Sequence, residues 1–139
     1  MSGGEQSCVK FAFFGDSICA GQGVSIHRTW AVRLSALLED ALGQSGRGLV
    51  TMNPSINGDT TWMALGRIAH DIQNHRVDAI MIQFGMNDAN HWDTDLGAPR
   101  VSEAAFAALA PSAIVQRAVT ASRISFSGGT AAGEISDAS

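Results

Sequence analysis

Apolar runs and segments of helical periodicity alternate along most of the chain. Short, almost continuous apolar runs that stop at or near a glycine or proline predict buried strands. The predicted strands are residues 8–14, 49–52 and 77–84. Apolar residues spaced three and four apart predict amphipathic helices. The predicted helices are residues 30–41, 65–72 and 106–115.

Local signals refine this pattern. Thr29 and Ser102 are expected to cap the first and third helices, and Pro111 is expected to break or kink the third helix at a cost of about 3 kcal/mol. Residues 15–27 contain three glycines and no helical period, which predicts a loop. The first helix is expected to bury Trp30, Leu34, Leu37, Leu38 and Ala41. The second helix is expected to bury Leu65, Ile68, Ala69 and Ile72.

Regular alternation of strands and helices predicts an α/β fold with right-handed crossovers and a parallel sheet. In such folds the ligand lies beyond the carboxyl ends of the strands. The polar segments that follow the three predicted strands should therefore meet at one edge of the sheet. These segments are residues 15–17, 57–59 and 85–88.

The chemistry of these segments suits acyl transfer, which needs a nucleophile, a base and donors for the oxyanion. Ser17 follows a buried strand, Gly58 offers an unobstructed backbone N–H, and Asn87 carries a neutral amide donor. Each residue alone is more typical of a turn or a cap. One such residue after each of three successive strands favours a shared site.

The same segments resemble the SGNH hydrolases, also called the GDSL esterase/lipase family. F-F-G-D-S-I at 13–18, N-P-S-I-N-G-D-T-T at 53–61 and F-G-M-N-D at 84–88 resemble the first three blocks of that family, in its order. The resemblance covers roughly residues 9–120. It implies a flavodoxin-like three-layer α/β/α fold with a five-stranded parallel sheet, a small-molecule ester as substrate, and no metal or organic cofactor.

The resemblance also implies roles for individual residues. Ser17 is the implied nucleophile. The implied oxyanion donors are the backbone N–H groups of Ser17 and Gly58 and the side-chain amide of Asn87. Asp16 and Asp88 are interpreted as structural residues that bind backbone amides around the loops.

The sequence departs from the family after Asn87. The family's last block, D-x-x-H, supplies the base and the residue that orients it, and the four histidines of this chain, His27, His70, His75 and His91, do not form it. We expect a C-terminally truncated family domain over residues 1–121 that lacks the last strand and helix. An irregular Ser/Gly/Ala-rich tail over 122–139 follows, with a possible strand at 124–126. We expect the protein to be nearly inactive as an esterase, because a serine without a positioned base is a poor nucleophile.

The missing block keeps other hypotheses open. One is a non-catalytic, ester- or carbohydrate-binding pseudoenzyme, and another is a flavodoxin-like binder of phosphate or flavin through residues 15–23. The latter segment has neither a Rossmann nor a Walker pattern. Loss of the last strand would also leave the strand at 79–84 with at most residues 123–126 beyond it. Such an apolar sheet edge predicts poor solubility or self-association.

Composition narrows the class of protein. Charged residues are only 16% of the chain, as buried strands require, and the net charge of −4 argues against a nucleic-acid binder. Without an apolar leader or a membrane-length run, a cytoplasmic protein is expected. Cys8 and Cys19 are expected to be free thiols, buried or half-buried. Of the side chains near the proposed site, Met86, Trp62 and Trp92 are candidates to shape a pocket, although core packing is expected for Trp62.

Overall fold

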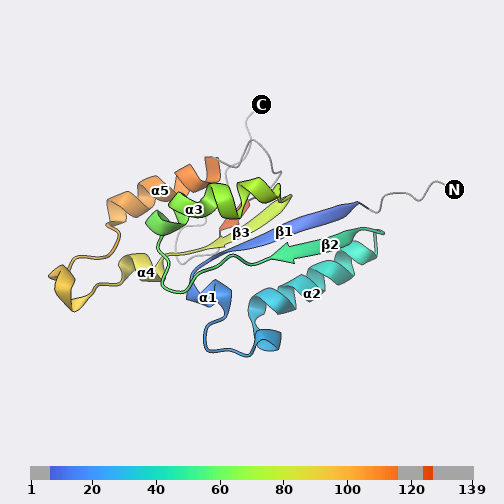
Figure 1. The fold of residues 1–139 in the computed structure, drawn as a ribbon, viewed down its shortest axis with the longest axis horizontal. Helices are drawn as coiled ribbons and strands as arrows, with labels where there is room; N and C mark the ends of the chain where they lie inside the picture. Colours follow the sequence, from blue (N-terminus) through green and yellow to red (C-terminus); the bar gives the residue numbers. More distant parts are fainter. Residues whose placement is uncertain (1–6, 116–123, 127–139) are drawn as a thin grey trace.

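A computed structural model describes residues 7–115 and 124–126 of the chain. In this part of the chain, parallel strands form one sheet in the order β2-β1-β3-β4 (Figure 1). The strands are β1 (Cys8–Gly15), β2 (Gly48–Met52), β3 (Ala79–Gln83) and β4 (Ile124–Phe126). The three predicted strands and the suggested strand at 124–126 are confirmed. The proposed boundary at residue 121 lies outside the described residues, as does most of the predicted tail.

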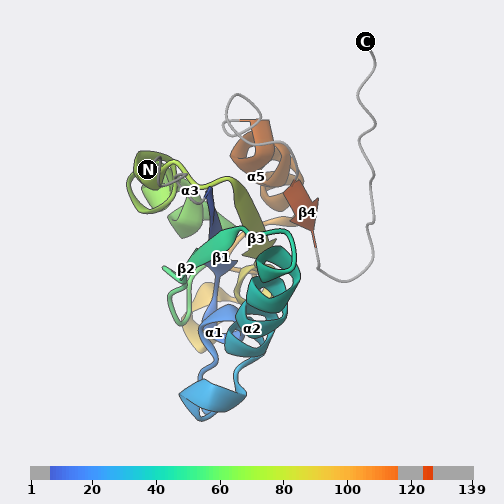
Figure 2. The same ribbon diagram turned by 90° about the vertical axis from the view of Figure 1, so that its right-hand side faces the viewer.

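Helices cover both faces of this sheet. Figures 1 and 2 show α2 on one face and α3 with α5 on the other, which gives the predicted three-layer arrangement. The α-helices are α1 (Ser17–Ala20), α2 (Trp30–Gly43), α3 (Thr61–Asp71), α4 (Met86–Ala89) and α5 (Glu103–Val115). Short 3₁₀ turns are η1 (Ile26–Arg28), η2 (Gln73–His75) and η3 (Asp93–Asp95).

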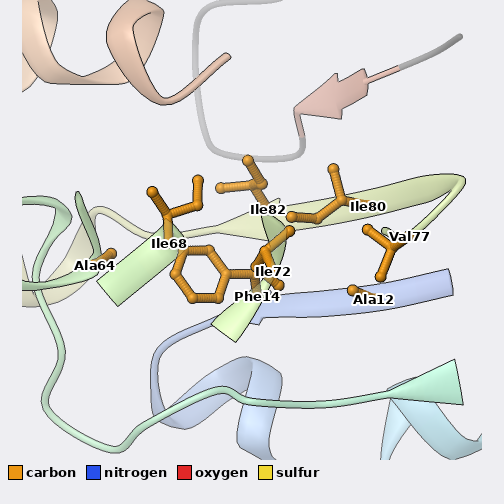
Figure 3. Packing of buried hydrophobic residues seen from close by; sticks show 8 residues of the cluster. All are labelled: Ala12, Phe14, Ala64, Ile68, Ile72, Val77, Ile80 and Ile82. Atoms are coloured by element: carbon orange, nitrogen blue, oxygen red, sulfur yellow. The ribbon is translucent and has the colours of Figure 1, made fainter. Parts of the chain in front are cut away.

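Alternation along β1 supplies both halves of the core. Ala12 and Phe14 pack with buried residues of α3 and β3, such as Ile68 (Figure 3). Phe13 faces the other way and packs with Cys19 of α1 and Ala31 of α2. Because successive strand residues point to opposite faces, one apolar strand anchors both helical layers. Each fully buried large side chain contributes about 1.5–3 kcal/mol.

The buried faces of two helices differ from the prediction. In α2, Leu37 is 67% exposed and Ala41 is also exposed, whereas Ala31 is buried. In α3, Ala69 is exposed and Ala64 is buried instead. In each helix, fewer residues contact the sheet than the apolar periodicity predicts. The apolar residues at the margins of the predicted face, such as Leu37 and Ala69, therefore remain exposed to solvent.

Three local predictions are also corrected. Residues 15–27 are not a plain loop, because Asp16 caps α1 by accepting a hydrogen bond from the N–H of Ile18 and η1 follows. The polar residues 87–100, which include Gly97 and Pro99, predict a loop, but this stretch contains most of α4 and all of η3. Helix α5 continues through Pro111 rather than ending there. A proline removes a single hydrogen bond from the helical ladder, so the turns on either side can carry the helix past it. The predicted caps Thr29 and Ser102 are confirmed.

Candidate active site

Backbone hydrogen bonds join the segments that follow β1, β2 and β3. The N–H of Asp16 donates to the carbonyl of Gln83 at 3.2 Å, and the N–H of Ile56 donates to the carbonyl of Gly15 at 3.1 Å. Both bonds lie at the carboxyl ends of the strands, at the end of the sheet where Figure 1 shows α1 and α4. The predicted convergence of the three segments at one edge is therefore observed.

Ser17 is the first residue of α1, directly after the capping residue Asp16. This tight turn requires glycine before it, because a Cβ on Gly15 would lie 2.5 Å from both Cys19 Cβ and the Gln83 carbonyl oxygen. Ser17 lines a surface hollow of about 380 Å³, together with side chains from α1, η1 and the start of α2. Neither Gly58 nor Asn87 lines that hollow.

Gly58 lies in a tight turn after β2. The N–H of Asp59 donates to the carbonyl of Ile56 at 3.2 Å, which closes the turn around Asn57 and Gly58. Gly58 has φ +78°, a left-handed conformation that glycine adopts without strain. Both central residues are exposed. Apart from Gly58 and its two chain neighbours, no atom of the described residues lies within 4 Å of where a Gly58 Cβ would be. The turn therefore presents bare backbone to solvent.

Asn87 lies on α4, and its side-chain nitrogen donates to the backbone carbonyl of Asp59 at 2.9 Å. This bond attaches the segment after β3 to the Gly58 turn. An asparagine amide has two N–H groups, so one remains after this bond. The neighbouring carboxylate of Asp88 is buried and accepts hydrogen bonds from the backbone N–H and the hydroxyl of Thr61. The structural roles predicted for Asp16 and Asp88 are confirmed.

The three predicted site residues are connected indirectly. Asn87 reaches the Gly58 turn through Asp59, and the segment carrying Ser17 reaches the other two through the bonds described above. Within residues 7–115 and 124–126, the backbone N–H groups of Ser17 and Gly58 have no hydrogen-bond acceptor. Both groups, and the second N–H of Asn87, thus retain the capacity to bind an oxygen.

Arg67 supports the segment after β2, a role that the sequence analysis missed. Its Nη2 lies 2.6 Å from Oδ2 of the buried Asp59, and its Nη1 donates to the carbonyl of Pro54 at 2.7 Å. Its guanidinium carbon lies 4.5 Å from the centre of the Phe14 ring. Arg67 thereby holds both ends of the Gly58 segment. The four-residue spacing of Arg67 and Asp71 was the available sequence signal, and it indicates only a helical ion pair.

Arg100 is a second residue that the sequence did not reveal. Its Nη1 donates to the carbonyl of Gly58 at 2.9 Å, and its guanidinium carbon lies 5.7 Å from the centre of the Trp92 ring. Its backbone N–H donates to the carbonyl of Asn90. Arg100 therefore connects the loop after α4 to the Gly58 turn.

None of the four histidines contacts Ser17 by a hydrogen bond within the described residues, and all four are exposed. Nδ1 of His70 lies 2.9 Å from Oδ1 of Asp71, and Nδ1 of His91 lies 2.9 Å from the Ala89 carbonyl oxygen. The hydrogen bond from His70, with those from Arg67, lowers the pKa of Asp71 despite some desolvation. The histidines thus have solvent-facing or local roles in the part of the chain that the structure describes.

Three large apolar side chains near these segments are exposed. Trp62 is 67%, Met86 is 69% and Trp92 is 59% exposed. The predicted core role of Trp62 is wrong, because the first turn of α3 directs Ala64 toward the sheet and leaves Trp62 outside.

The cysteines are free: Cys19 is buried, and Cys8 is exposed rather than half-buried. Burial raises the pKa of the Cys19 thiol.

In the part of the chain that the structure describes, no three His, Cys, Asp or Glu side chains form a group that could hold a metal ion. No helix there is long and apolar enough to span a membrane.

This chain is similar to known proteins in sequence and in fold. An arylesterase from Vibrio mimicus is 35% identical over 88 residues, which cover 63% of this chain and 42% of that protein. The crystal structure of TesA superposes with a TM-score of 0.65 at 23% identity, covering 84% of this chain and 58% of TesA. An acetylxylan esterase from Geobacillus stearothermophilus, Axe2, gives a TM-score of 0.70 at 21% identity, covering 86% of this chain and 59% of Axe2.

The chain therefore spans less than two thirds of each of these proteins. The family comparison covers more of the chain itself. Residues 13–131 match the GDSL-like lipase/acylhydrolase family, and the matched segment contains Ser17, Gly58 and Asn87. With the parallel sheet and the three joined segments at its carboxyl edge, this match shows that the chain belongs to the GDSL-like lipase/acylhydrolase family.

Proposed function

We propose that this chain is an ester hydrolase in which Ser17 is the nucleophile. The oxyanion of the tetrahedral intermediate is bound by the backbone N–H groups of Ser17 and Gly58 and by the side-chain amide of Asn87. The observation that carries the proposal is the hydrogen bond from Asn87 to the Asp59 carbonyl. It fixes one N–H of the amide beside the Gly58 turn and leaves the other for a ligand.

The proposed reaction has two steps. Ser17 Oγ attacks the acyl carbon, its proton passes to a base, and the negative charge gathers on the carbonyl oxygen. The intermediate collapses to an acyl-serine and releases the alcohol, and water then hydrolyses the acyl-serine. Donors already in position stabilise the oxyanion, and removing one typically costs about 2.7–4 kcal/mol.

The base limits the rate in this proposal. No histidine is hydrogen bonded to Ser17 within the described residues, and the sequence has no D-x-x-H after Asn87. We propose that turnover by this chain is strongly impaired. In an unrelated triad enzyme, removal of one member leaves only about 10³–10⁴-fold catalysis over water, from the oxyanion hole and binding.

The proposed substrates are small acyl or acetyl esters. The related arylesterase and acetylxylan esterase favour this class. The net charge of −4 disfavours nucleic acid as a partner. A cytoplasmic location stays a prediction from the sequence.

The test is covalent labelling with a fluorophosphonate probe, combined with turnover of p-nitrophenyl acetate. Labelling at Ser17 that disappears in Ser17→Ala supports the proposal that Ser17 is the nucleophile. Slow turnover supports the proposal that Ser17 lacks a positioned base. Turnover at a rate normal for an esterase would overturn the proposed impairment. Failure of the folded protein to label would favour the alternative, a non-catalytic protein that binds esters or carbohydrates at the same edge. The observation behind that alternative is that no histidine is hydrogen bonded to Ser17 within the described residues.

A further inference from the structure

The Asn57–Gly58 turn has a chemical property that oxyanion binding does not use. The side-chain carboxamide of Asn57 stands next to a backbone nitrogen whose N–H has no acceptor within the described residues. Both residues are exposed, and glycine places no side chain over that nitrogen. An asparagine followed by such a nitrogen has an electrophilic carbon and a nucleophile one residue apart.

We propose that Asn57 is a site of spontaneous deamidation in which the nucleophile is the nitrogen of Gly58, itself the proposed oxyanion donor. The deprotonated Gly58 nitrogen attacks Cγ of Asn57. A new N–Cγ bond forms, the Cγ–Nδ2 bond breaks, and ammonia leaves with the transferred protons. Water then opens the resulting five-membered succinimide at either carbonyl, which gives aspartate or isoaspartate at position 57. The step needs water alone and involves no oxidation or reduction.

The other four asparagines lack this arrangement. Asn53 precedes Pro54, whose nitrogen has no hydrogen and cannot act in this way. The Asn90 side-chain oxygen already accepts a hydrogen bond from the next backbone N–H, and the Asn87 amide is held by Asp59. Asn74 precedes His75, whose backbone N–H donates to the carbonyl of Ile72.

The rest of the turn is fixed, which confines the change to one peptide unit. Arg100 holds the Gly58 carbonyl, and Arg67 holds the buried Asp59. While the succinimide persists, the Gly58 nitrogen carries no hydrogen and cannot donate. After hydrolysis a carboxylate stands beside the oxyanion position, and isoaspartate also lengthens the backbone by one carbon. This consequence rests on the proposed function, whereas the modification itself does not.

The experiment ages the full chain in mildly alkaline buffer and follows both chemistry and labelling. Tryptic peptide 48–67 contains Asn53 and Asn57 together, so fragmentation compares the two sites within one molecule. We expect conversion of the amide to the acid at Asn57, with a share methylated by an isoaspartyl methyltransferase, and little conversion at the other four asparagines. Asn57→Ser removes the electrophilic carbon, so the mass of its peptide 48–67 should not change during ageing. Conversion at Asn57 no faster than at the other asparagines would overturn the proposal.

Fluorophosphonate labelling of the same samples separates the two claims. We expect the succinimide fraction, which lacks the Gly58 N–H, to label about 10²-fold more slowly, the loss typical of a missing oxyanion donor. The hydrolysed fraction regains that N–H and should label more slowly than unmodified protein because its new carboxylate opposes the negative charge. Aged Asn57→Ser should label as fresh Asn57→Ser does. If modified and unmodified protein label equally at Ser17, the proposed consequence is wrong although the site is real. If fresh protein does not label at all, the proposed function fails and the mass result still decides the modification.

Discussion

The side-chain nitrogen of Asn87 lies 2.9 Å from the backbone carbonyl oxygen of Asp59 and donates a hydrogen bond to it. This bond joins a residue that follows β3 to the turn that follows β2. The acceptor is a backbone atom. The orientation of the amide, and therefore of its free N–H, does not depend on a second, flexible side chain.

Substitution Asn87→Asp should slow fluorophosphonate labelling of Ser17 by about 10²–10³-fold. The substitution keeps the shape of the side chain but removes both N–H donors and adds a negative charge. The measurement is the second-order labelling rate. Asn90→Ala is the control, because among the described residues Asn90 bonds only to α4 and to its own loop. An equal loss in both variants would contradict a specific role for Asn87.

Substitution Arg100→Ala should lower the maximal labelling rate more than it raises the probe concentration needed for half of that rate. Arg100 holds the Gly58 carbonyl, so its loss should misplace the oxyanion donor without removing a contact to the probe. Arg100→Lys, which keeps the charge but loses the planar fork, should recover part of the rate. A change confined to probe affinity would show that Arg100 contacts the ligand instead.

Substitution Arg67→Met should reduce the free energy of unfolding by about 3–5 kcal/mol, because it leaves the buried carboxylate of Asp59 without its partner. The side chain of Asp59 is 2% exposed, whereas that of Asp71 is 21% exposed. Asp71→Asn should therefore cost only about 1 kcal/mol or less. Urea unfolding measures both values, and the double variant Asp59→Asn, Arg67→Met should be more stable than Arg67→Met alone.

Cys19 should resist alkylation in the folded protein while Cys8 reacts. Cys19 is fully buried, and burial raises its pKa above the ordinary value of 9.0. The folded state thus favours the neutral thiol. The stability that the folded protein gains by burying Cys19 as a neutral thiol should be complete below pH 9.0. It should be lost as the pH rises through the folded pKa of Cys19.

Mass spectrometry after iodoacetamide treatment, with and without denaturant, checks the reactivity of each thiol. Comparison of Cys19→Ala with the unsubstituted chain checks the pH dependence. The variant should lose less stability than the unsubstituted chain as the pH rises above 9.0. Equal loss in both proteins would show that other groups cause the alkaline destabilisation.

The sequence predicts self-association at the outer edge of β3, but β4 pairs with that edge. The protein should therefore self-associate through the edge of the sheet at β2. Within the described residues no strand pairs with the outer edge of β2, and Val50 on this strand is 53% exposed. Val50→Lys should reduce association, because a lysine on an edge strand opposes pairing with a second edge. Sedimentation equilibrium at several concentrations measures it, and a monomer at every concentration would count against the prediction.

Local sequence was enough to predict the strands, two helix caps and the common edge of the three loops. The run ending at Gly15 is apolar except for Lys10, and Thr29 caps α2 through its own side chain. These features depend on neighbouring residues, whose propensities the sequence displays directly. The parallel order then places Ser17, Gly58 and Asn87 at one edge because parallel strands all end on the same side.

The tertiary structure alone decided which apolar residues are buried and which residues support the site. Leu37 and Ala31 both fit an apolar helical face, and contact with Phe13 selects Ala31. Arg100 reaches Gly58 from 42 positions further along the chain, through a loop without periodicity. Propensity and spacing act over a few residues, whereas these contacts exist only after the chain has closed long loops and packed its layers.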